Sequence, residues 1–173
     1  YSPRSKEDVI IPKEIKFKSR EYKVAVISEE SFKDNKKIKI INFTDDSELV
    51  SIKRNAFYCS SLTSIFIPPS LEELQDRWCA LTWDLIHVSI SPKNNFFTLI
   101  ENKKIIVGKS NQMKPNYDVL VFACRDIERA IIPSTIQKID SFAFSFCKKL
   151  TGSIVLPEKL EFMGQYAFNG CSA

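Results

Sequence analysis

A pattern that recurs about every 24 residues constrains the fold of this chain more than any other feature. Each copy contains a short run in which apolar and polar residues alternate, which is typical of a strand with one buried face. The last apolar residues of these runs follow one another at steps of 24, 23, 42 and 24 residues, and they are Phe43, Ile67, Ile90, Ile132 and Leu156. Because a single copy cannot bury that face alone, we expect the copies to stack, to pair their strands in parallel and to share one core.

A second motif lies between these runs and places an Ala-Phe pair shortly before a cysteine. The pairs are Ala56-Phe57, Ala143-Phe144 and Ala167-Phe168, and the cysteines are Cys59, Cys147 and Cys171. We expect the alanine to lie where the chain turns tightly and the phenylalanine to fill the core. The cysteine is predicted to act as a small buried residue at a turn. The copy around Trp78 departs from the motif, because it reads Trp-Cys-Ala where Ala-Phe is expected.

The composition agrees with a folded chain and excludes several classes of protein. The chain has 173 residues, of which 44% are hydrophobic and 27% charged, and it contains four glycines. These values exclude a disordered or collagen-like chain, and no apolar stretch is long enough for a membrane-spanning helix. The net charge of +4 comes from residues 1–40, which carry 11 basic and 7 acidic side chains. Such a lobe attracts acidic partners or nucleic acid. Because no basic stripe is interleaved with stacking aromatic residues, we expect a solvated face and no nucleic-acid partner.

No arrangement of residues in the sequence points to catalysis or to a metal. The chain has five cysteines and one histidine, and none of the cysteines falls in a CxxC pair, so we expect no metal site and no cofactor. His87 is expected on a strand, and nothing in the sequence places a cysteine beside it for a nucleophilic pair. Adjacent carboxylates such as Glu72-Glu73 are typical of solvated turns. We therefore do not expect an enzyme.

Together, the two motifs resemble the BspA-like class of leucine-rich repeats. The family pattern I-x-x-x-A-F-x-x-C-x-x-L-x-x-I-x-I-P is represented here by Ile139, Ala143, Phe144, Cys147, Leu150, Ile154, Leu156 and Pro157. With its inserted segment, the chain is most similar to the protozoan members of this family, such as trichomonad surface antigens. The resemblance implies a leucine-rich-repeat solenoid of the α/β class, rich in β-structure. It also implies a parallel β-sheet on one face and short helical or irregular returns on the other.

Four segments follow from this interpretation. Residues 1–21 are expected to form a degenerate first coil or an N-terminal cap, and residues 22–92 the first set of repeats. The segment 93–126 contains two β-rich runs on either side of the polar loop 109–116, which predicts one inserted β-hairpin. Residues 127–173 hold the remaining repeats, and the last repeat breaks off at the C-terminus. We expect either a longer protein or end-to-end self-association there.

The outward side chains of the predicted strands are the candidate partner-binding residues. They alternate with the buried side chains and form two rows across the predicted sheet. These residues are Ile40, Asn42, Ser64, Phe66, His87, Ser89, Arg129, Ile131, Ser153 and Val155. Apolar side chains interrupt a face that should be polar, which suits a protein partner, or else the inserted hairpin covers part of the face. The sequon at Asn42 permits N-glycosylation if the chain enters a secretory pathway.

Two functions remain open on this evidence. The first, implied by the family resemblance, is a non-catalytic protein–protein recognition module in a cell-surface or secreted adhesin-like protein, with a host or neighbouring-cell protein as its partner. The alternative is an intracellular structural or scaffold protein, cytoplasmic or cytoskeletal, that uses the same repeat faces. The odd number of cysteines and the absence of a leader after Tyr1 favour the alternative.

Overall fold

The computed structural model describes residues 7–171 and consists of strands, turns and irregular segments. The chain divides into two compact units, residues 1–95 and 96–173, and the boundary falls inside the predicted inserted segment 93–126. Residues 1–6 of the predicted N-terminal segment, and Ser172 and Ala173 at the end of the last one, lie outside the described residues. No helix long and apolar enough to cross a membrane is found within the described range.

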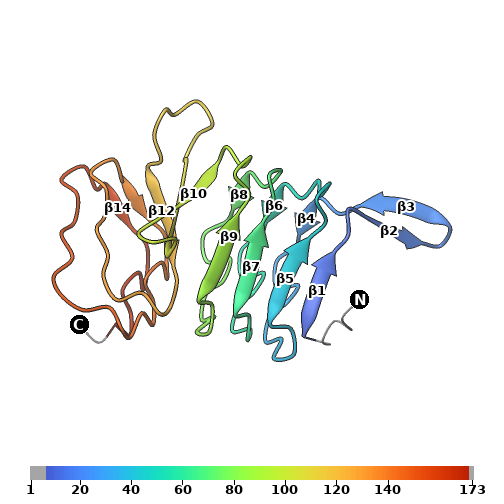
Figure 1. The fold of residues 1–173 in the computed structure, drawn as a ribbon, viewed down its shortest axis with the longest axis horizontal. Coiled ribbons are helices and arrows are strands. Elements are labelled where there is room, and N and C mark those ends of the chain that lie inside the picture. The colour runs from blue at the N-terminus through green and yellow to red at the C-terminus, as the bar shows by residue number, and fades with distance from the viewer. Residues whose placement is uncertain (1–6, 172–173) are drawn as a thin grey trace. The chain divides into compact units, whose positions relative to one another are not determined.

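The first unit is built on a sheet of four parallel strands (Figure 1). In spatial order these strands are β1 (Asp8–Ile11), β5 (Ile40–Phe43), β7 (Ser64–Ile67) and β9 (His87–Ile90). The register aligns Ile41 with Ile65 and Ile65 with Val88, and all three side chains are buried. The strands predicted to end at Phe43, Ile67 and Ile90 are therefore confirmed, together with their parallel pairing.

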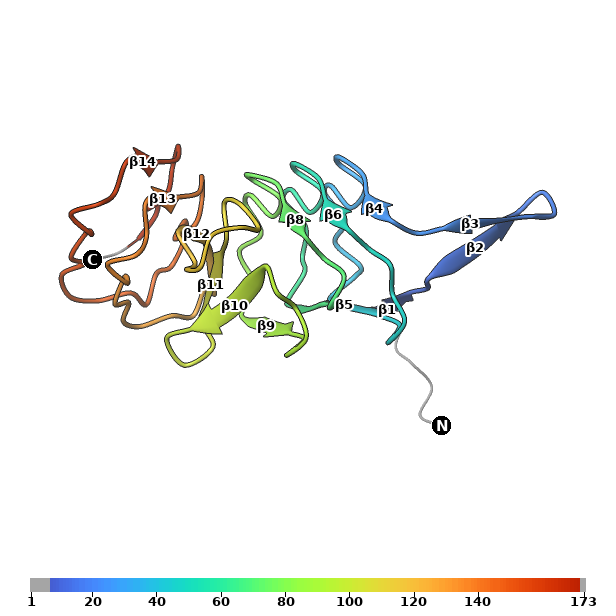
Figure 2. The same cartoon turned by 90° about the horizontal axis from the view of Figure 1, so that it is seen from above.

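A second parallel sheet in the first unit is made of shorter strands (Figure 2). They are β4 (Val26–Ile27), β6 (Ser51–Ile52) and β8 (Glu73–Leu74). Three successive repeats thus contribute one strand to each of two sheets, through β1 and β4, β5 and β6, and β7 and β8, whereas the sequence led us to expect a single sheet. The third sheet is a hairpin of β2 (Glu14–Phe17) and β3 (Arg20–Lys23), which lies between β1 and β4 in the chain.

The returns of the repeats are irregular turns that contain two residues of left-handed backbone conformation, four positions apart. The pairs are Glu30 and Asp34, Asn55 and Cys59, Arg77 and Leu81, Phe142 and Phe146, and Tyr166 and Gly170. Backbone hydrogen bonds join successive turns, for example from Phe57 N to Trp78 O at 2.9 Å and from Phe144 N to Ala167 O at 2.7 Å. A left-handed residue cannot continue a right-handed helix. Of the two kinds of return that were expected, the irregular one is therefore found, and the helical one is not, because no helix occurs between residues 7 and 171.

The second unit has one mixed sheet in which the predicted insertion supplies the first strands. Its strands, in order, are β10 (Phe97–Ile100), β11 (Ile105–Gly108), β12 (Val119–Ala123), β13 (Lys138–Ile139) and β14 (Phe162–Met163). The first three pair antiparallel, and β12, β13 and β14 pair in parallel. The antiparallel pairing expected across the polar loop 109–116 is therefore present. The insertion also joins the repeat sheet through β12.

The expected strands ending at Ile132 and Leu156 are absent, and both segments are extended but irregular. Thr151 N donates a hydrogen bond to Glu128 O at 2.9 Å. Beyond that point, no backbone hydrogen bond joins residues 129–132 to residues 153–156 in the part of the chain that the structure describes. One extra residue, Gly152, with a φ of 82°, turns the chain just before the second segment. Only in the first unit, therefore, do the repeats form the predicted ladder.

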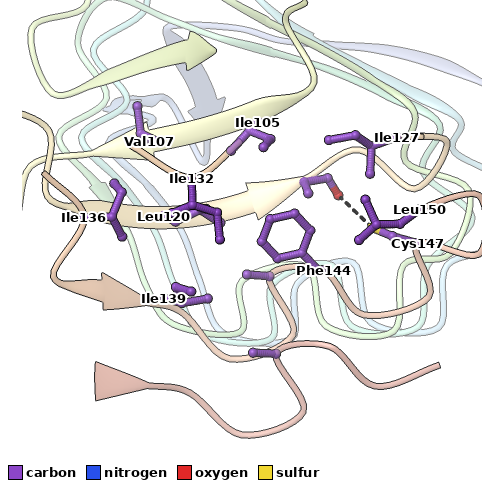
Figure 3. Packing of buried hydrophobic residues seen from close by; sticks show 13 residues of the cluster. Ile105, Val107, Leu120, Ile127, Ile132, Ile136, Ile139, Phe144, Cys147 and Leu150 are labelled. Carbon is purple, nitrogen blue, oxygen red and sulfur yellow. Dashed lines mark hydrogen bonds between the residues drawn. The ribbon is translucent and has the colours of Figure 1, made fainter. Parts of the chain in front are cut away.

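The core of the second unit surrounds Phe144, whose side chain is fully buried (Figure 3). Its ring stacks on Phe168 with 4.8 Å between the ring centroids. Aliphatic side chains from β11, β12, β13 and the following segments complete the cluster, including Ile105, Val107, Leu120, Ile127, Ile132, Ile136, Ile139 and Leu150. The Ala-Phe motif is thus a core motif, as predicted.

Candidate protein-binding surface

Six of the ten predicted partner-binding residues lie on the outer face of the sheet in the first unit. One row runs across the four strands through Asp8, Ile40, Ser64 and His87. In the second row the register aligns Ile10 with Asn42, and Phe66 with Ser89. These residues alternate with the buried Ile41, Ile65 and Val88, so the predicted orientation of the face is confirmed.

The accessibility of this face increases towards β9. His87 and Ser89 are exposed, whereas the side chains on β5 and β7 are half-buried by their neighbours on the sheet. Phe66 belongs to this half-buried set. Asn42 is also half-buried and lies on β5, which has a paired strand on each side. Its glycosylation stays a prediction.

The other four predicted residues lie in the second unit, on the two irregular segments. Arg129 and Ile131 lie on one segment, and Ser153 and Val155 on the other. They were expected to occupy rows of a shared sheet, and this expectation is wrong because the two segments do not pair as strands. All four side chains are nevertheless exposed, with values of 72% for Ile131 and 79% for Val155.

Three of these four residues line a groove of about 370 Å³ between the two segments. The lining consists of Ala130, Ile131, Ile132, Ser134, Ser153, Val155, Leu156, Pro157 and Glu158. Sequence reasoning missed Leu156 as a surface residue, because its place in the repeat predicted a buried side chain, whereas it is 43% exposed. Glu158 is the one charged residue of the lining, and Ser134 and Ser153 add hydroxyl groups. The groove is therefore suited to apolar contact with a partner, together with a few polar contacts.

The sequence profile of the BspA type leucine rich repeat region matches residues 9–105 and 116–173, as six copies. The chain belongs to the BspA-type leucine-rich-repeat family. The trichomonad-type subgroup stays a prediction. A comparison with curated proteins gives no match.

Solved structures share this BspA-type fold at low sequence identity. The pneumococcal vaccine antigen PcpA is 23% identical, with a TM-score of 0.78 over 95% of this chain and 37% of that one. A leucine rich cell surface protein from Faecalibacterium prausnitzii is 20% identical, with a TM-score of 0.75 over 95% and 39%. A leucine-rich repeat protein from Eubacterium ventriosum is 19% identical, with a TM-score of 0.69 over 95% and 45%. The chain spans less than half the length of each, and the likeness shows the fold alone.

The cysteines of the BspA-type repeats are thiols, and no disulfide joins them within the described residues. The Cys147 thiol donates to the carbonyl oxygen of Cys124 at 3.7 Å, and the Cys171 thiol donates to Phe144 O at 3.1 Å. Burial raises the pKa of both Cys124 and Cys147 to about 11. Protonated, buried thiols are poor nucleophiles, which fits a structural role.

Cys59 does not occupy the same position as Cys147, contrary to the sequence-based alignment. Its backbone N donates a hydrogen bond to Ala80 O, just as Phe146 N donates one to Asn169 O. Both donor residues have a left-handed backbone conformation. Cys59 is therefore equivalent to Phe146, and Ser60 takes the place of Cys147. The alignment failed because the repeat at 143–150 has one more residue between Phe144 and Leu150 than the earlier repeat has between Phe57 and Leu62.

Proposed function

We propose that this chain is a solenoid module for non-catalytic protein–protein recognition, in a cell-surface or secreted adhesin-like protein. The observation that carries the proposal is the exposure of Ile131 and Val155 beside the groove of the second unit. Two large aliphatic side chains that are more than two-thirds exposed on neighbouring segments form a binding patch for an apolar partner surface. Fully burying such a side chain stabilises a complex by about 1.5–3 kcal/mol.

The outer face of the sheet in the first unit supports the same function. Ile40 and Phe66 are apolar and half-buried, while His87 and Ser89 are exposed at the β9 end. This mixture of aromatic, aliphatic and polar side chains is typical of surfaces that bind proteins. Because the side chains project from paired strands, their positions are set by the sheet and little conformational entropy is lost when a partner binds.

The proposed surface location is supported by the names of two structural neighbours. One is called a vaccine antigen and another a cell surface protein. These names describe those proteins, and the location is carried over to this chain as part of the proposal. A host or neighbouring-cell protein is the partner class that such a location would offer.

A second candidate function, an intracellular scaffold, is favoured by the state of the cysteines. All five are thiols in this structure, and Cys124 and Cys147 are fully buried in the core. Thiols of this kind persist in a reducing compartment. The scaffold would use the same groove and sheet face to join partners inside the cell.

Labelling intact source cells with a membrane-impermeant amine reagent separates the two functions. Exposed lysines such as Lys148 and Lys149 should be labelled before lysis if the protein is at the cell surface. Protection of these lysines until the cells are broken would contradict the surface location and favour the scaffold.

The binding surface is tested with a photo-cross-linking residue placed at Val155. The matched control places the same residue at Met113, which is 88% exposed, belongs to the polar loop 109–116 and is not one of the residues that line the groove. A protein partner should be captured at Val155 and not at Met113. Val155→Asp should then weaken binding of that partner at least about tenfold through loss of apolar contact, whereas Met113→Asp should not. Equal capture at both positions, or unchanged binding of Val155→Asp, would contradict the proposed groove.

A further inference from the structure

The β2–β3 hairpin is an addition to the first repeat, and none of its side chains belongs to the core. It occupies the connection between β1 and β4, residues 12–25, whereas the matching connections of later repeats are residues 44–50 and 68–72. All eight residues of its strands are exposed, and both views show it extending away from the two larger sheets of its unit (Figures 1 and 2). Because its side chains are exposed, packing within the repeat does not explain why some of them are apolar. An isolated two-stranded hairpin is also only marginally stable in water, so a partner surface would stabilise it.

The register of the hairpin separates its side chains into two faces. Directly opposite residues of antiparallel strands point to the same face. One face carries Ile15 opposite Tyr22, and Phe17 opposite Arg20. The other face carries the charged pairs Glu14 with Lys23 and Lys16 with Glu21. The exposed fractions are 50% for Ile15, 60% for Phe17 and 46% for Tyr22, so the first face is an open apolar strip that ends in an aromatic ring near the tip.

The charge of the hairpin is positive and remains so at its tip. Residues 13–23 carry five basic and two acidic side chains, a net charge of +3. At the base, the Glu48 carboxylate lies 2.9 Å from Lys13 Nζ and 2.7 Å from Lys23 Nζ. At the tip, Lys18 Nζ lies 5.4 Å from the centroid of the Phe17 ring, and Arg20 faces the same side. A carboxylate thus holds the base to the repeat, while the tip presents one aromatic ring and two basic residues.

We propose that this hairpin docks on an anionic lipid surface. Phe17, Ile15 and Tyr22 enter the headgroup region, where aromatic side chains are favoured, and Lys18 and Arg20 contact lipid phosphates. The charge of the tip complements an anionic bilayer and disfavours a second copy of this chain, because two such tips would repel each other. The hairpin projects from the repeat and has no groove in which a partner segment could bind. A lipid surface can accept such a projecting hairpin without a preformed pocket. This contact is separate from the partner-binding residues and goes beyond the proposed recognition of a protein.

The test measures co-sedimentation of the whole chain with vesicles of phosphatidylcholine alone, or of phosphatidylcholine with phosphatidylglycerol as the minor component. We expect binding to the anionic vesicles only, and loss of binding at high salt because exposed charges are then screened. Lys18→Gln with Arg20→Gln should weaken binding about 30-fold, since each basic residue near an anionic surface contributes about fivefold. Phe17→Ser should also weaken it.

The matched control is Lys148→Gln with Lys149→Gln, which removes the same charge from two exposed residues elsewhere. This variant should bind as the unaltered chain does. Equal binding to neutral and anionic vesicles, or an equal loss in the control variant, would overturn the proposal. Binding to a soluble polyanion such as polyglutamate without binding to anionic vesicles would also overturn it, and would assign the hairpin to an acidic macromolecule. Circular dichroism melts confirm that each variant remains folded.

Discussion

Replacing Phe144 by alanine tests the central claim about how the repeats are held together. The side chain is fully buried, lies in the middle of the core of the second unit and stacks on Phe168 at 4.8 Å. Truncating a buried phenylalanine costs about 3–5 kcal/mol, because apolar contacts are lost and a cavity remains. The stacked ring pair contributes about 0.5–1.5 kcal/mol beyond buried area. We therefore expect Phe144→Ala to lower the free energy of unfolding of the second unit by about 4 kcal/mol.

Urea denaturation followed by two probes measures this effect. Both tryptophans, Trp78 and Trp83, lie in the first unit, so fluorescence reports on that unit while far-ultraviolet circular dichroism reports on the whole chain. With a denaturant slope of about 1–3 kcal/mol per molar, the dichroism midpoint should fall by at least about 1.3 M. Phe162→Ala is the matched control, because Phe162 is 52% exposed, and it should cost less than about 1 kcal/mol. A loss below about 1.5 kcal/mol for Phe144→Ala, with an unchanged slope, would refute its place in the core.

Three further predictions follow from packing and charge. Trp78→Ala should lower the free energy of unfolding by about 3–5 kcal/mol, and adding Cys79→Phe should restore part of this loss, because residues 78 and 79 then match the Ala-Phe motif. A double-mutant cycle measures the coupling between the two substitutions, and simple additivity would contradict the equivalence of this pair with the motif. Hydrogen bonds from two lysines lower the pKa of Glu48 from 4.5 to about 2. The contribution of Glu48 to the stability of the folded chain should therefore be complete above pH 4.5 and disappear as the pH falls towards 2, and an NMR titration midpoint near 4.5 would contradict these contacts. Because burial raises the pKa of Cys124 and Cys147 to about 11, neither thiol should react with a disulfide reagent at neutral pH until the chain unfolds, and rapid labelling of the native protein would contradict their burial.

The ladder of the first unit was predictable because alternation determines which side chains are buried. Ile41, Ile65 and Val88 recur at almost constant spacing, and shifting one strand by a single residue would move its apolar side chains to the opposite face. Only one register therefore buries all of them. The same physical constraint determines the outer face, because Phe66 and His87 alternate with these buried residues along their strands.

Alternation could not reveal where the ladder stops. Residues 130–132 and 154–156 show the same apolar pattern as β5 and β7, yet they remain unpaired with each other beyond Thr151. Hydrogen bonds between strands depend on the path of both segments, and the extra Gly152 changes that path for one of them. Leu156 is consequently exposed at a groove, although its position in the repeat predicts a core residue.

The positions of the turn residues could not be predicted because residue type carried too little information. Left-handed conformation usually favours glycine or asparagine. Here the ten left-handed turn positions include Arg77, Leu81, Phe142 and Phe146, and only the last pair contains a glycine, Gly170. Their conformation is set by backbone hydrogen bonds to the neighbouring turns, which are long-range contacts.

The hairpin shows why a surface element escapes an interpretation built on repeats. Residues 14–17 alternate between polar and apolar side chains, Tyr22 lies on the same face as Ile15 across Lys18-Ser19, and two residues between such runs are a hairpin signal. Neither residue is the glycine or asparagine that such turns favour, although both have positive φ. Interpreted against the 24-residue pattern, the same stretch is only a degenerate coil. The 24-residue period is preserved in the repeats because each one must bury the apolar side chains of the next. A segment that contacts only solvent or a partner is under no such constraint. The residues that depart from the period and yet remain apolar are therefore the ones in which to look for binding, and Ile15, Phe17 and Tyr22 meet both conditions.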